Sequence, residues 1–279
     1  LSCAQRREQR LSTHFSVGMP AMTDRVLVTG GTGKTGQLVA GLLALRGIDV
    51  RIGTRSPVLA GQVRFDWNDT ATHEPALEGV DAAYIVAPTD RMEQLSVMRP
   101  FLERAVSHVS GRLVLLSASS LQAGGPMMGE VHSWLMAQAT LWTVLRPTWF
   151  MQNFTTQHLR SILQEGCVYS ATGNGRVSFI DAADIAAVAV EALTNPALPS
   201  SDHVLTGPET LSYDDVGQAI SARTGLIVRH CRLSVDDLAA RYAASGIPQS
   251  YALTLAHMDE AIAQGAEDRI TAEVERITG

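Results

Sequence analysis

The stretch Val28-Thr-Gly-Gly-Thr-Gly-Lys-Thr-Gly36 decides the fold class of this 279-residue chain. It directly follows the β-rich run 25–29 and precedes a helical pattern of leucines. Its glycines Gly30, Gly33 and Gly36 have the spacing GxxGxxG between a strand and a helix. In this context the first glycine permits a tight turn, the second lets the backbone approach a pyrophosphate, and the third allows close helix packing. The helix N-terminus adds free N–H groups for the anion.

A phosphate-binding Walker A loop is the main alternative interpretation of this stretch. Gly33-Lys34-Thr35 resembles the end of such a loop, but the motif needs a glycine five residues before Gly33, where this chain has Val28. The spacing therefore favours a dinucleotide-binding turn over a P-loop, and a glycine-rich turn without any ligand is the remaining alternative. The loop residues expected to contact the dinucleotide are Gly30, Thr32, Gly33, Lys34, Thr35 and Gly36.

Short apolar runs alternate with helical patterns along the first half of the chain. The later runs contain little charge, as is typical of strands that are buried on both faces of a parallel sheet. Strands that alternate with helices of this length imply right-handed βαβ units. We therefore expect an α/β fold with a Rossmann-type doubly wound parallel sheet. Its expected strands are 25–29, 50–54, 63–65, 83–86, 113–116 and 142–145, and its expected helices are 34–46, 91–108 and 129–139.

The pattern loosens after Pro147. Ser212 with Asp215, and likewise Ser234 with Asp237, have the spacing of a capping box with Asp in place of Glu, so each pair predicts a helix start. We expect a small C-terminal α/β region that packs on the carboxyl end of the sheet, where open α/β sheets bind ligands. Its expected helices are 150–163, 181–193, 213–223 and 235–244, and its expected extended segments are 167–170 and 226–232.

Composition divides the chain into three parts. Residues 1–21 combine three arginines and one acid with no hydrophobic period, which predicts a disordered leader or a remnant of expression, with a transit-like segment as the alternative. Residues 22–150 are expected to form the Rossmann domain that binds the dinucleotide. Residues 151–279 are expected to form the substrate-binding region, packed intimately on that domain.

Charge and composition exclude several classes of protein. Hydrophobic residues make up 46% of the chain, which is too many for disorder, and the longest apolar stretch, 38–45, is too short to span a bilayer. The net charge of −6 argues against a nucleic-acid binder. The spacing of Cys3, Cys167 and Cys231 indicates neither a disulfide framework nor a metal site. We expect a soluble, cytoplasmic monomer or homodimer in a reducing compartment, whose partner is a small-molecule substrate.

The end of the second expected strand indicates which dinucleotide binds. A cofactor with a free ribose 2′-OH usually meets an acid at this position. Here the strand ends in Thr54 and Arg55, which can donate hydrogen bonds to a 2′-phosphate, although Arg55 as an ordinary surface residue is the alternative. We therefore expect NADP(H) rather than NAD(H). Asp66, after the third strand, is placed to meet the adenine amino group or to cap a turn.

Three further segments, together with 28–36, carry a family resemblance. They are Leu113-Val-Leu-Leu-Ser-Ala-Ser-Ser120, Trp142-Thr-Val-Leu-Arg-Pro-Thr-Trp-Phe-Met-Gln-Asn-Phe154 and Val177-Ser-Phe-Ile-Asp-Ala-Ala-Asp-Ile-Ala186. With these segments the chain, from residue 25 to 279, resembles the short-chain dehydrogenase/reductase superfamily. It is most similar to the atypical NmrA-like branch and, within it, to the festuclavine-synthase-like group of ergot-alkaloid biosynthesis. The resemblance implies an NAD(P)H-dependent oxidoreductase with a Rossmann sheet and a small C-terminal substrate region.

Relatives of this kind often use a Tyr-x-x-x-Lys pair to move a proton to or from the substrate oxygen. None of the five tyrosines here is followed by lysine at that spacing, and the usual places of the pair fall near Gly124 and Met128. We therefore expect hydride transfer to a small, largely apolar acceptor that is already activated, an imine or iminium, a quinone or an enone, because it needs less proton assistance. The alternatives are an NADP(H)-sensing regulator without turnover, and a non-redox isomerase or lyase.

The remaining candidate residues lie at or after strand ends. Ser117 and Ser119 end the fifth expected strand, where the superfamily keeps its catalytic serine, with a strand-end cap as the alternative. His132 is a candidate acid or else a helix-surface histidine. Ala87, Ser117 and Pro147 are expected near the nicotinamide. An apolar segment with one amide follows the sixth strand and suits a small-ligand pocket, although its two phenylalanines would also suit simple packing. The residues expected to bind substrate are Trp149, Phe150, Asn153 and Phe154.

Overall fold

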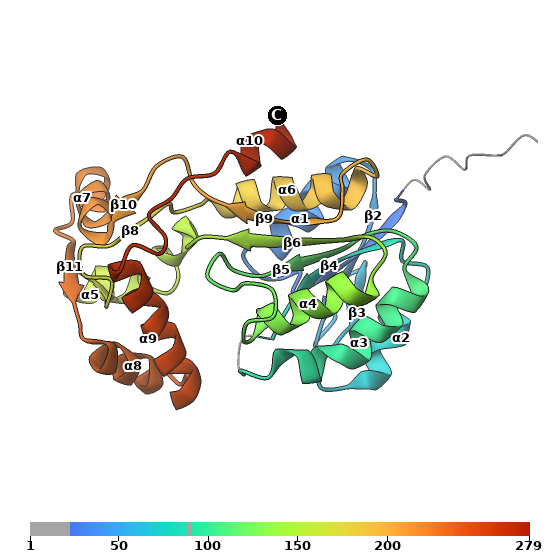
Figure 1. Ribbon diagram of the computed structural model, residues 1–279, viewed down its shortest axis with the longest axis horizontal. Helices are drawn as coiled ribbons and strands as arrows, with labels where there is room; N and C mark the ends of the chain where they lie inside the picture. The colour runs from blue at the N-terminus through green and yellow to red at the C-terminus, as the bar shows by residue number, and fades with distance from the viewer. Residues whose placement is uncertain (1–22, 89–90) are drawn as a thin grey trace, which may run out of the picture.

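The computed structural model describes residues 23–88 and 91–279, and its centre is a seven-stranded parallel sheet (Figure 1). The strand order is β3-β2-β1-β4-β5-β6-β9, so the order reverses between β1 and β4. Such a reversal is the place where open α/β sheets bind ligands. The order and the parallel pairing confirm the predicted Rossmann-type doubly wound sheet. The strands are β1 (Arg25–Thr29), β2 (Asp49–Thr54), β3 (Gln62–Arg64), β4 (Ala82–Val86), β5 (Leu113–Leu116), β6 (Trp142–Pro147) and β9 (Ser201–Leu205).

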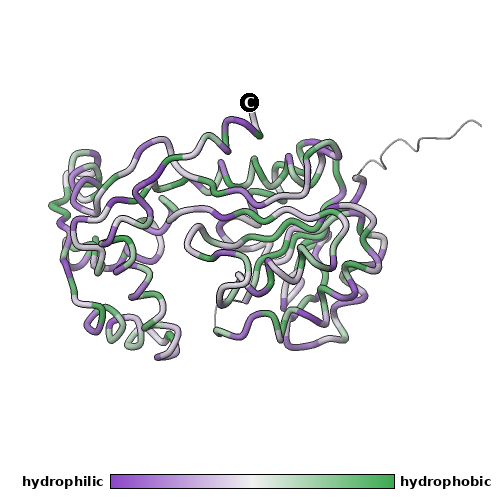
Figure 2. Tube along the Cα trace, in the orientation of Figure 1, coloured by the Kyte–Doolittle hydropathy of each residue, from purple (hydrophilic) through white to green (hydrophobic). Residues whose placement is uncertain are grey.

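Helices cover both faces of this sheet (Figure 1). On β1, Leu27 contributes to one hydrophobic cluster, whereas Val26 and Val28 contribute to the cluster on the opposite face, as the two-residue period of a strand requires. Figure 2 shows hydrophobic residues concentrated along these central strands. One face is covered by α1 (Gly36–Leu45), α6 (Ala182–Thr194) and α10 (Glu273–Thr278), and the other by α2 (His73–Leu77), α3 (Gln94–His108) and α4 (Met128–Gln138).

The chain after residue 150 lies beside the carboxyl ends of the strands and also returns to the main sheet through β9 and α6 (Figure 1). The division at residue 150 stays a prediction. The capping box predicted at the start of α7 is confirmed, because the backbone N–H of Asp215 donates to Ser212 Oγ and that of Ser212 donates to the Asp215 carboxylate. The smaller elements are β7 (Cys167–Ser170) with β11 (Arg229–Arg232), β8 (Arg176–Val177) with β10 (Leu211–Ser212), and the helices α5 (Leu159–Glu165), α7 (Tyr213–Thr224), α8 (Val235–Ala244) and α9 (Gln249–Ala263).

The single helix predicted over 150–163 is wrong in its first half. The structure has a 3-10 turn, η3 (Met151–Asn153), and α5 begins only at Leu159. Between them the hydroxyls of Thr155 and Thr156 donate to the carbonyl of Gln152 at 3.1 and 2.8 Å. Such side-chain bonds compete with the helical backbone pattern, and for this reason the helical spacing of the apolar residues here was misleading.

Strand β9 was not predicted because it lacks an apolar run. It contains Asp202, which accepts a 2.8 Å ion pair from Arg146 Nη1 on the neighbouring strand β6. The pairing with a strand almost 60 residues earlier, rather than local hydrophobicity, places this segment in the sheet.

The expectation of unpaired cysteines is wrong for Cys167 and Cys231, which form a disulfide with their Cα atoms 5.7 Å apart. They lie on β7 and β11, two parallel neighbours separated by 64 residues in sequence. Only the pairing of these strands brings the sulfur atoms within bonding distance. Cys3 and the predicted leader 1–21 lie outside the described residues.

Candidate active site

The glycine-rich loop has the tight geometry that its motif predicts. Gly30 has a φ of +62°, and the N–H of Gly33 donates to the carbonyl of Gly30 at 2.9 Å. A Cβ atom on Gly36 would lie 2.3 Å from that same carbonyl oxygen, closer than any real contact of this kind. The loop therefore folds back on itself against the start of α1, which presents the helix N-terminus to a phosphate. This cradle suits the pyrophosphate of a dinucleotide.

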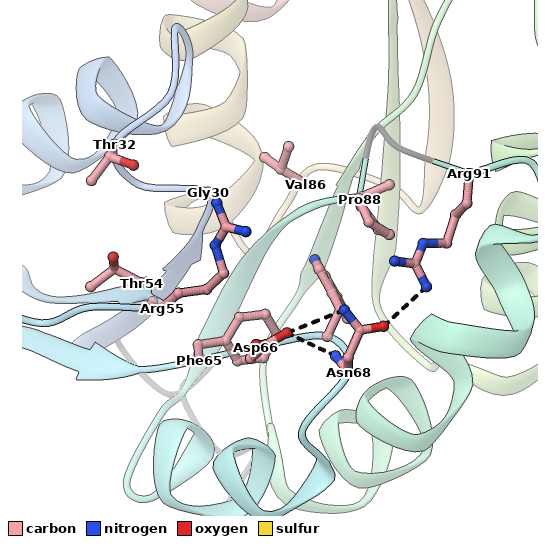
Figure 3. A pocket seen from close by; sticks show the side chains of 13 residues that line it. Gly30, Thr32, Thr54, Arg55, Phe65, Asp66, Asn68, Val86, Pro88 and Arg91 are labelled. Atoms are coloured by element: carbon pink, nitrogen blue, oxygen red, sulfur yellow. Dashed lines mark hydrogen bonds between the residues drawn. The ribbon is translucent and has the colours of Figure 1, made fainter. Parts of the chain in front are cut away.

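A pocket of about 410 Å³, here called the loop pocket, lies between this loop and the ends of β2, β3 and β4 (Figure 3). The loop pocket lies where the strand order reverses, between β1 and β4. The structure brings together in its wall six of the twelve residues predicted to bind the cofactor. The other six lie outside the lining, and they are Gly33, Lys34, Thr35, Gly36, Ser117 and Pro147. The predicted residues that line it are Gly30, Thr32, Thr54, Arg55, Asp66 and Ala87.

Two guanidinium groups face the loop pocket. Figure 3 shows Arg55 extending from the end of β2 toward Gly30, with Arg91 on the other side, where its Nη1 donates to Asn68 Oδ1 at 3.0 Å. Guanidinium groups bind phosphate through paired hydrogen bonds, so this pocket suits an anionic nucleotide. Sequence reasoning missed Arg91, although its place shortly after β4 at the strand-order reversal is a usable signal.

Asp66 serves as a turn cap in the loop pocket. Its Oδ1 accepts a hydrogen bond from the backbone N–H of Asn68 at 2.9 Å. The carboxylate therefore holds the turn after β3 while it lines the pocket. The predicted contact with an adenine amino group stays a prediction, and it is compatible with this position.

The two serines after β5 have different surroundings. The Ser117 hydroxyl is buried and has no hydrogen-bond partner within the described residues. Ser119 Oγ instead donates to Glu267 Oε2 at 2.8 Å, and the Ser119 carbonyl accepts from Arg146 at 2.8 Å. Burial raises the pKa of Glu267. Ser119 thus ties the C-terminal segment to the sheet, whereas Ser117 lies outside the described linings of both cavities, and its predicted contact with the nicotinamide stays a prediction.

His132 lies under α4 rather than on its surface. Its ring is 2% exposed, packs 5.9 Å from the Trp142 ring, and has no hydrogen-bond partner for either nitrogen within the described chain. Burial lowers its pKa, so the ring is neutral at pH 7. It lines neither the loop pocket nor the cavity described next, so the catalytic role predicted for it has no geometric support.

A second cavity of about 1020 Å³, here called the large cavity, lies between the loop and helices α5, α8 and α9. Sequence reasoning missed it, because its wall comes from helices far along the chain. The polar residues of its wall include Lys34, His158, Glu165 and Arg241. Its apolar and aromatic wall consists of Tyr169, Leu238, Tyr242, Ile247, Pro248, Tyr251 and Leu255.

The predicted substrate residues relate to the large cavity in two ways. Trp149 and Phe154 pack against the hydrophobic cluster of the C-terminal region, and Phe150 packs against the cluster beneath α6, so none of the three is part of the described lining of the large cavity. The Phe154 ring stacks on His158 at a centroid distance of 5.4 Å and holds that ring in place. Asn153 reaches the cavity edge, because its Oδ1 accepts a 2.7 Å hydrogen bond from Lys34 Nζ.

Two ionisable residues in the wall of the large cavity, His158 and Glu165, have shifted pKa values. Burial, and secondarily the charge of Lys34, lowers the pKa of His158 to about 4, so this imidazole is neutral at pH 7. The Glu165 carboxylate accepts from the Tyr169 hydroxyl at 2.7 Å and from Arg241 at 2.8 Å, and these bonds lower its pKa. The Arg241 guanidinium also lies 3.8 Å over the Tyr169 ring. The charges of Glu165 and Arg241 therefore compensate each other within the wall.

Residues 23–88 and 91–279 offer neither a metal site nor a membrane span. This part of the chain contains no group of three or more His, Cys, Asp or Glu side chains arranged to hold a metal ion. It also contains no helix that combines the length and the apolar character needed to cross a membrane.

Known proteins resemble the chain over nearly its whole length. The uncharacterized oxidoreductase YesF of Bacillus subtilis is 41% identical over 258 residues, which cover 91% of this chain and 90% of that protein. The agroclavine dehydrogenase of Claviceps fusiformis is 40% identical over 267 residues, which cover 91% and 92%. An NADPH-dependent quinone oxidoreductase from Escherichia coli, solved with NADPH, has a TM-score of 0.76 at 20% identity and covers 91% of this chain and 94% of that chain.

Two family models match as well. The model described as NAD(P)H-binding matches residues 30–196, and the model of the NmrA-like family matches residues 131–276. Together they span both cavities and the loop between them. The sequence similarity and the fold thus agree with the geometry of the site: the chain belongs to the NmrA-like family of NAD(P)H-binding proteins.

Proposed function

We propose that this protein is an NADPH-dependent oxidoreductase that transfers hydride to a small, largely apolar, activated acceptor in the large cavity. The observation that carries the proposal is the position of the glycine-rich loop, whose backbone borders the loop pocket while Lys34 borders the large cavity. Relatives in the family are named oxidoreductases, among them a dehydrogenase of agroclavine, and a protein of the same fold is named a quinone oxidoreductase.

Named residues would hold the cofactor. The loop from Gly30 to Gly36 would bind the pyrophosphate, and Thr54 with Arg55 would bind the 2′-phosphate. The free hydroxyl of Ser117 would orient the carboxamide at the inner end of the site. A bound dihydronicotinamide supplies the hydride, and the chain supplies orientation and exclusion of water.

Two of the five tyrosines, Tyr84 and Tyr213, lie outside the described linings of both cavities. Tyr84 is fully buried and donates to Thr35 Oγ1 at 3.0 Å, and burial raises its pKa well above the ordinary value. Tyr213 is likewise buried, with a raised pKa. Neither phenol is placed to exchange protons with a substrate near neutral pH. Tyr169, Tyr242 and Tyr251 do line the large cavity, but none of them has a lysine four residues later. The absence of a Tyr-x-x-x-Lys pair favours imines or iminium ions, quinones and enones over simple ketones and alcohols.

A panel assay tests the function. Purified protein is mixed with NADPH or NADH, and their oxidation is followed against an imine, a quinone and an enone. Faster turnover with NADPH than with NADH, for at least one acceptor class, is the expected result. Tight NADPH binding with no oxidation by any acceptor would favour an NADP(H)-sensing regulator instead, as the absence of the Tyr-x-x-x-Lys pair allows. Failure to bind either dinucleotide would reject both functions.

A further inference from the structure

Lys34 is chemically unique in this protein. Among the 22 lysine and arginine residues of the chain it is the one lysine. A guanidinium does not release its proton near neutral pH, whereas an ammonium group does so readily once burial disfavours its charge. The single amine side chain of the protein therefore lies in the glycine-rich loop, at the wall of the large cavity.

The side chain of Lys34 is directed at the acceptor cavity. Its Nζ donates to Asn153 Oδ1 at 2.7 Å, and the residue lines the large cavity but not the loop pocket. Its backbone remains in the loop, between Gly33 and Thr35. The expected contact with the dinucleotide therefore falls to the backbone of the loop, and the ammonium group is left for the acceptor. Asn153, from the turn η3, holds its direction.

The surroundings of Lys34 leave its charge uncompensated. Burial lowers its pKa, and its neighbour His158 is neutral at pH 7. Glu165 is the acidic residue in the described lining of the large cavity, and its carboxylate already accepts hydrogen bonds from Tyr169 and Arg241. The Lys34 ammonium group would therefore stabilise negative charge that develops on a bound acceptor. The ionisable groups that face this cavity from α5, β7, α8 and α9 and the adjoining turns are His158, Arg160, Glu165, Tyr169, Arg241, Tyr242 and Tyr251.

We propose that Lys34 is the catalytic proton donor of the reduction, and that the acceptor is a neutral conjugated carbonyl compound of the quinone or enone class. This inference rests on the proposed reductase function. The acceptor gains a hydride from the dinucleotide, which is oxidised, and its π electron pair moves onto the carbonyl oxygen. The Lys34 N–H bond then breaks as the new O–H bond forms. The neutral amine regains its proton from solvent, so the acceptor gains two electrons and two hydrogens in all.

The charge of Lys34 also selects against cationic acceptors. A preformed iminium ion needs no proton when it takes a hydride, and it would be repelled by the ammonium group in the wall of the cavity. Substitution of Lys34 should therefore have opposite consequences for a neutral quinone and for a cation. This contrast separates proton donation from a general structural role.

The kinetic test compares two acceptors in single-turnover oxidation of bound NADPH. The acceptors are menadione, a neutral quinone, and N-methylacridinium, a cation that takes hydride on carbon without a proton. Lys34→Gln removes the charge and the proton, and Lys34→Arg keeps the charge alone. Both variants should slow menadione reduction about 100-fold or more, within the usual range for general acid catalysis. Neither should slow reduction of N-methylacridinium, and Arg99→Gln, an exposed change on α3, should leave both rates unaltered.

A second measurement needs no turnover. Because Lys34 is the single lysine, protein with isotope-labelled lysine gives one side-chain NMR signal, whose titration reports its pKa directly. The midpoint should lie below the ordinary 10.5, in the wild-type protein without ligand. The same spectra show whether the protein is folded, and circular dichroism checks the variants.

Four results would overturn the inference. If Lys34→Gln loses only NADPH affinity, Lys34 is a pyrophosphate ligand. If the variants reduce menadione as fast as the wild-type protein, or if the lysine titrates at or above the ordinary value, Lys34 is not the acid while the reductase function stands. If the wild-type protein oxidises NADPH with neither acceptor, both the function and the inference fail.

Discussion

The loop pocket and the large cavity share the glycine-rich loop, yet they are built in different ways. The lining of the loop pocket falls within residues 30–91, so one continuous stretch of βαβ chain supplies it. The large cavity takes Lys34 from the loop and the rest of its described wall from residues 157–255. A site made by a backbone motif and by strand ends is visible in sequence. A site made by the packing of distant helices is not.

The two cavities also use charge differently. The loop pocket presents Arg55 and Arg91, whose permanent charge suits a phosphate. The large cavity presents tyrosines and one amine, with its carboxylate neutralised inside the wall. Under the two proposals above, the cofactor would be held by fixed charge, and the acceptor by the shape of the cavity and by a group that can release a proton. Perturbing each cavity separately tests this division.

Loss of the disulfide should have the largest effect on stability, and it should act on the large cavity alone. Cys167→Ser removes the bond between two residues that are 64 positions apart in sequence, which should lower the free energy of unfolding by about 4 kcal/mol. Tyr169 on β7 lines the large cavity, so acceptor affinity should fall while NADPH affinity stays unchanged. Urea unfolding and NADPH titration measure the two effects.

The second cysteine supplies the control for this prediction. Cys231→Ser breaks the same bond, so it should match Cys167→Ser, and the double variant should lose no more stability than either single variant. Additive losses would mean that the two side chains stabilise the protein separately and that the bond contributes little.

A methyl group in the glycine-rich loop should have the converse effect. Gly36→Ala places a Cβ atom 2.3 Å from the Gly30 carbonyl oxygen, which is backbone and has little room to move. We expect a loss of about 3 kcal/mol in stability and no measurable NADPH binding. Thermal unfolding and NADPH titration check both effects.

The same helix offers the matched control, because a Cβ on Gly41 would meet nothing within 4 Å. Gly41→Ala should therefore stabilise α1 by about 0.5–1 kcal/mol and keep NADPH affinity. If both variants bind NADPH normally, the cradle is not the cofactor site.

Arg55→Ala should sharpen the assignment of the loop pocket to NADPH. Removal of a charge-assisted pair with the 2′-phosphate should weaken NADPH binding by about 1.5–3 kcal/mol, while NADH binding changes little. Equilibrium titration with both dinucleotides gives the ratio, with Arg99→Ala as the control on α3. Equal losses for NADPH and NADH would remove the case for recognition of the 2′-phosphate.

Asp259, behind the large cavity on α9, should make stability depend on pH. Burial raises its pKa to about 7, although its carboxylate accepts from the backbone N–H of Ala171. The native state then keeps a proton that the unfolded state releases above pH about 4. Its contribution is present at low pH and is lost as pH rises toward 7, with a slope of at most about 1.4 kcal/mol per pH unit.

Denaturation between pH 4 and pH 8 tests this, with Asp259→Asn expected to flatten the slope and the exposed Asp236→Asn expected to leave it unchanged. The neighbouring phenols of Tyr213 and Tyr242 stay protonated over this range, because burial raises both of their pKa values. A wild-type slope that Asp259→Asn does not alter would place the titration elsewhere.

Much of the fold was predictable because its signals are local. The strand Arg25–Thr29 has the predicted bounds, and the helix start at Ser212 has the predicted cap. Segments whose structure depends on pairing or on side-chain hydrogen bonds were not predicted correctly. The strand Ser201–Leu205 is polar in part and is placed by its pairing with β6, and the turn at Gln152 interrupts an apparently helical run.

In the candidate site, too, local features were predictable and features that depend on distant contacts were not. Arg55 and Asp66 lie in the loop pocket as expected, because strand ends in a parallel sheet converge at one edge. His132 was expected at the reaction centre and is buried under α4, and the pairing of Cys167 with Cys231 was not foreseen. Sequence spacing along a helix does not show which face the fold will cover.

The amino-acid sequence by itself determined the first six strands of the central sheet, the glycine-rich turn and the residue types at strand ends, because these follow from local periodicity and backbone sterics. Tertiary structure alone decided the large cavity, the disulfide and the direction of the Lys34 side chain. These depend on contacts between segments more than 60 residues apart, such as the 119-residue separation between Lys34 and Asn153, and packing rather than pattern determines such contacts.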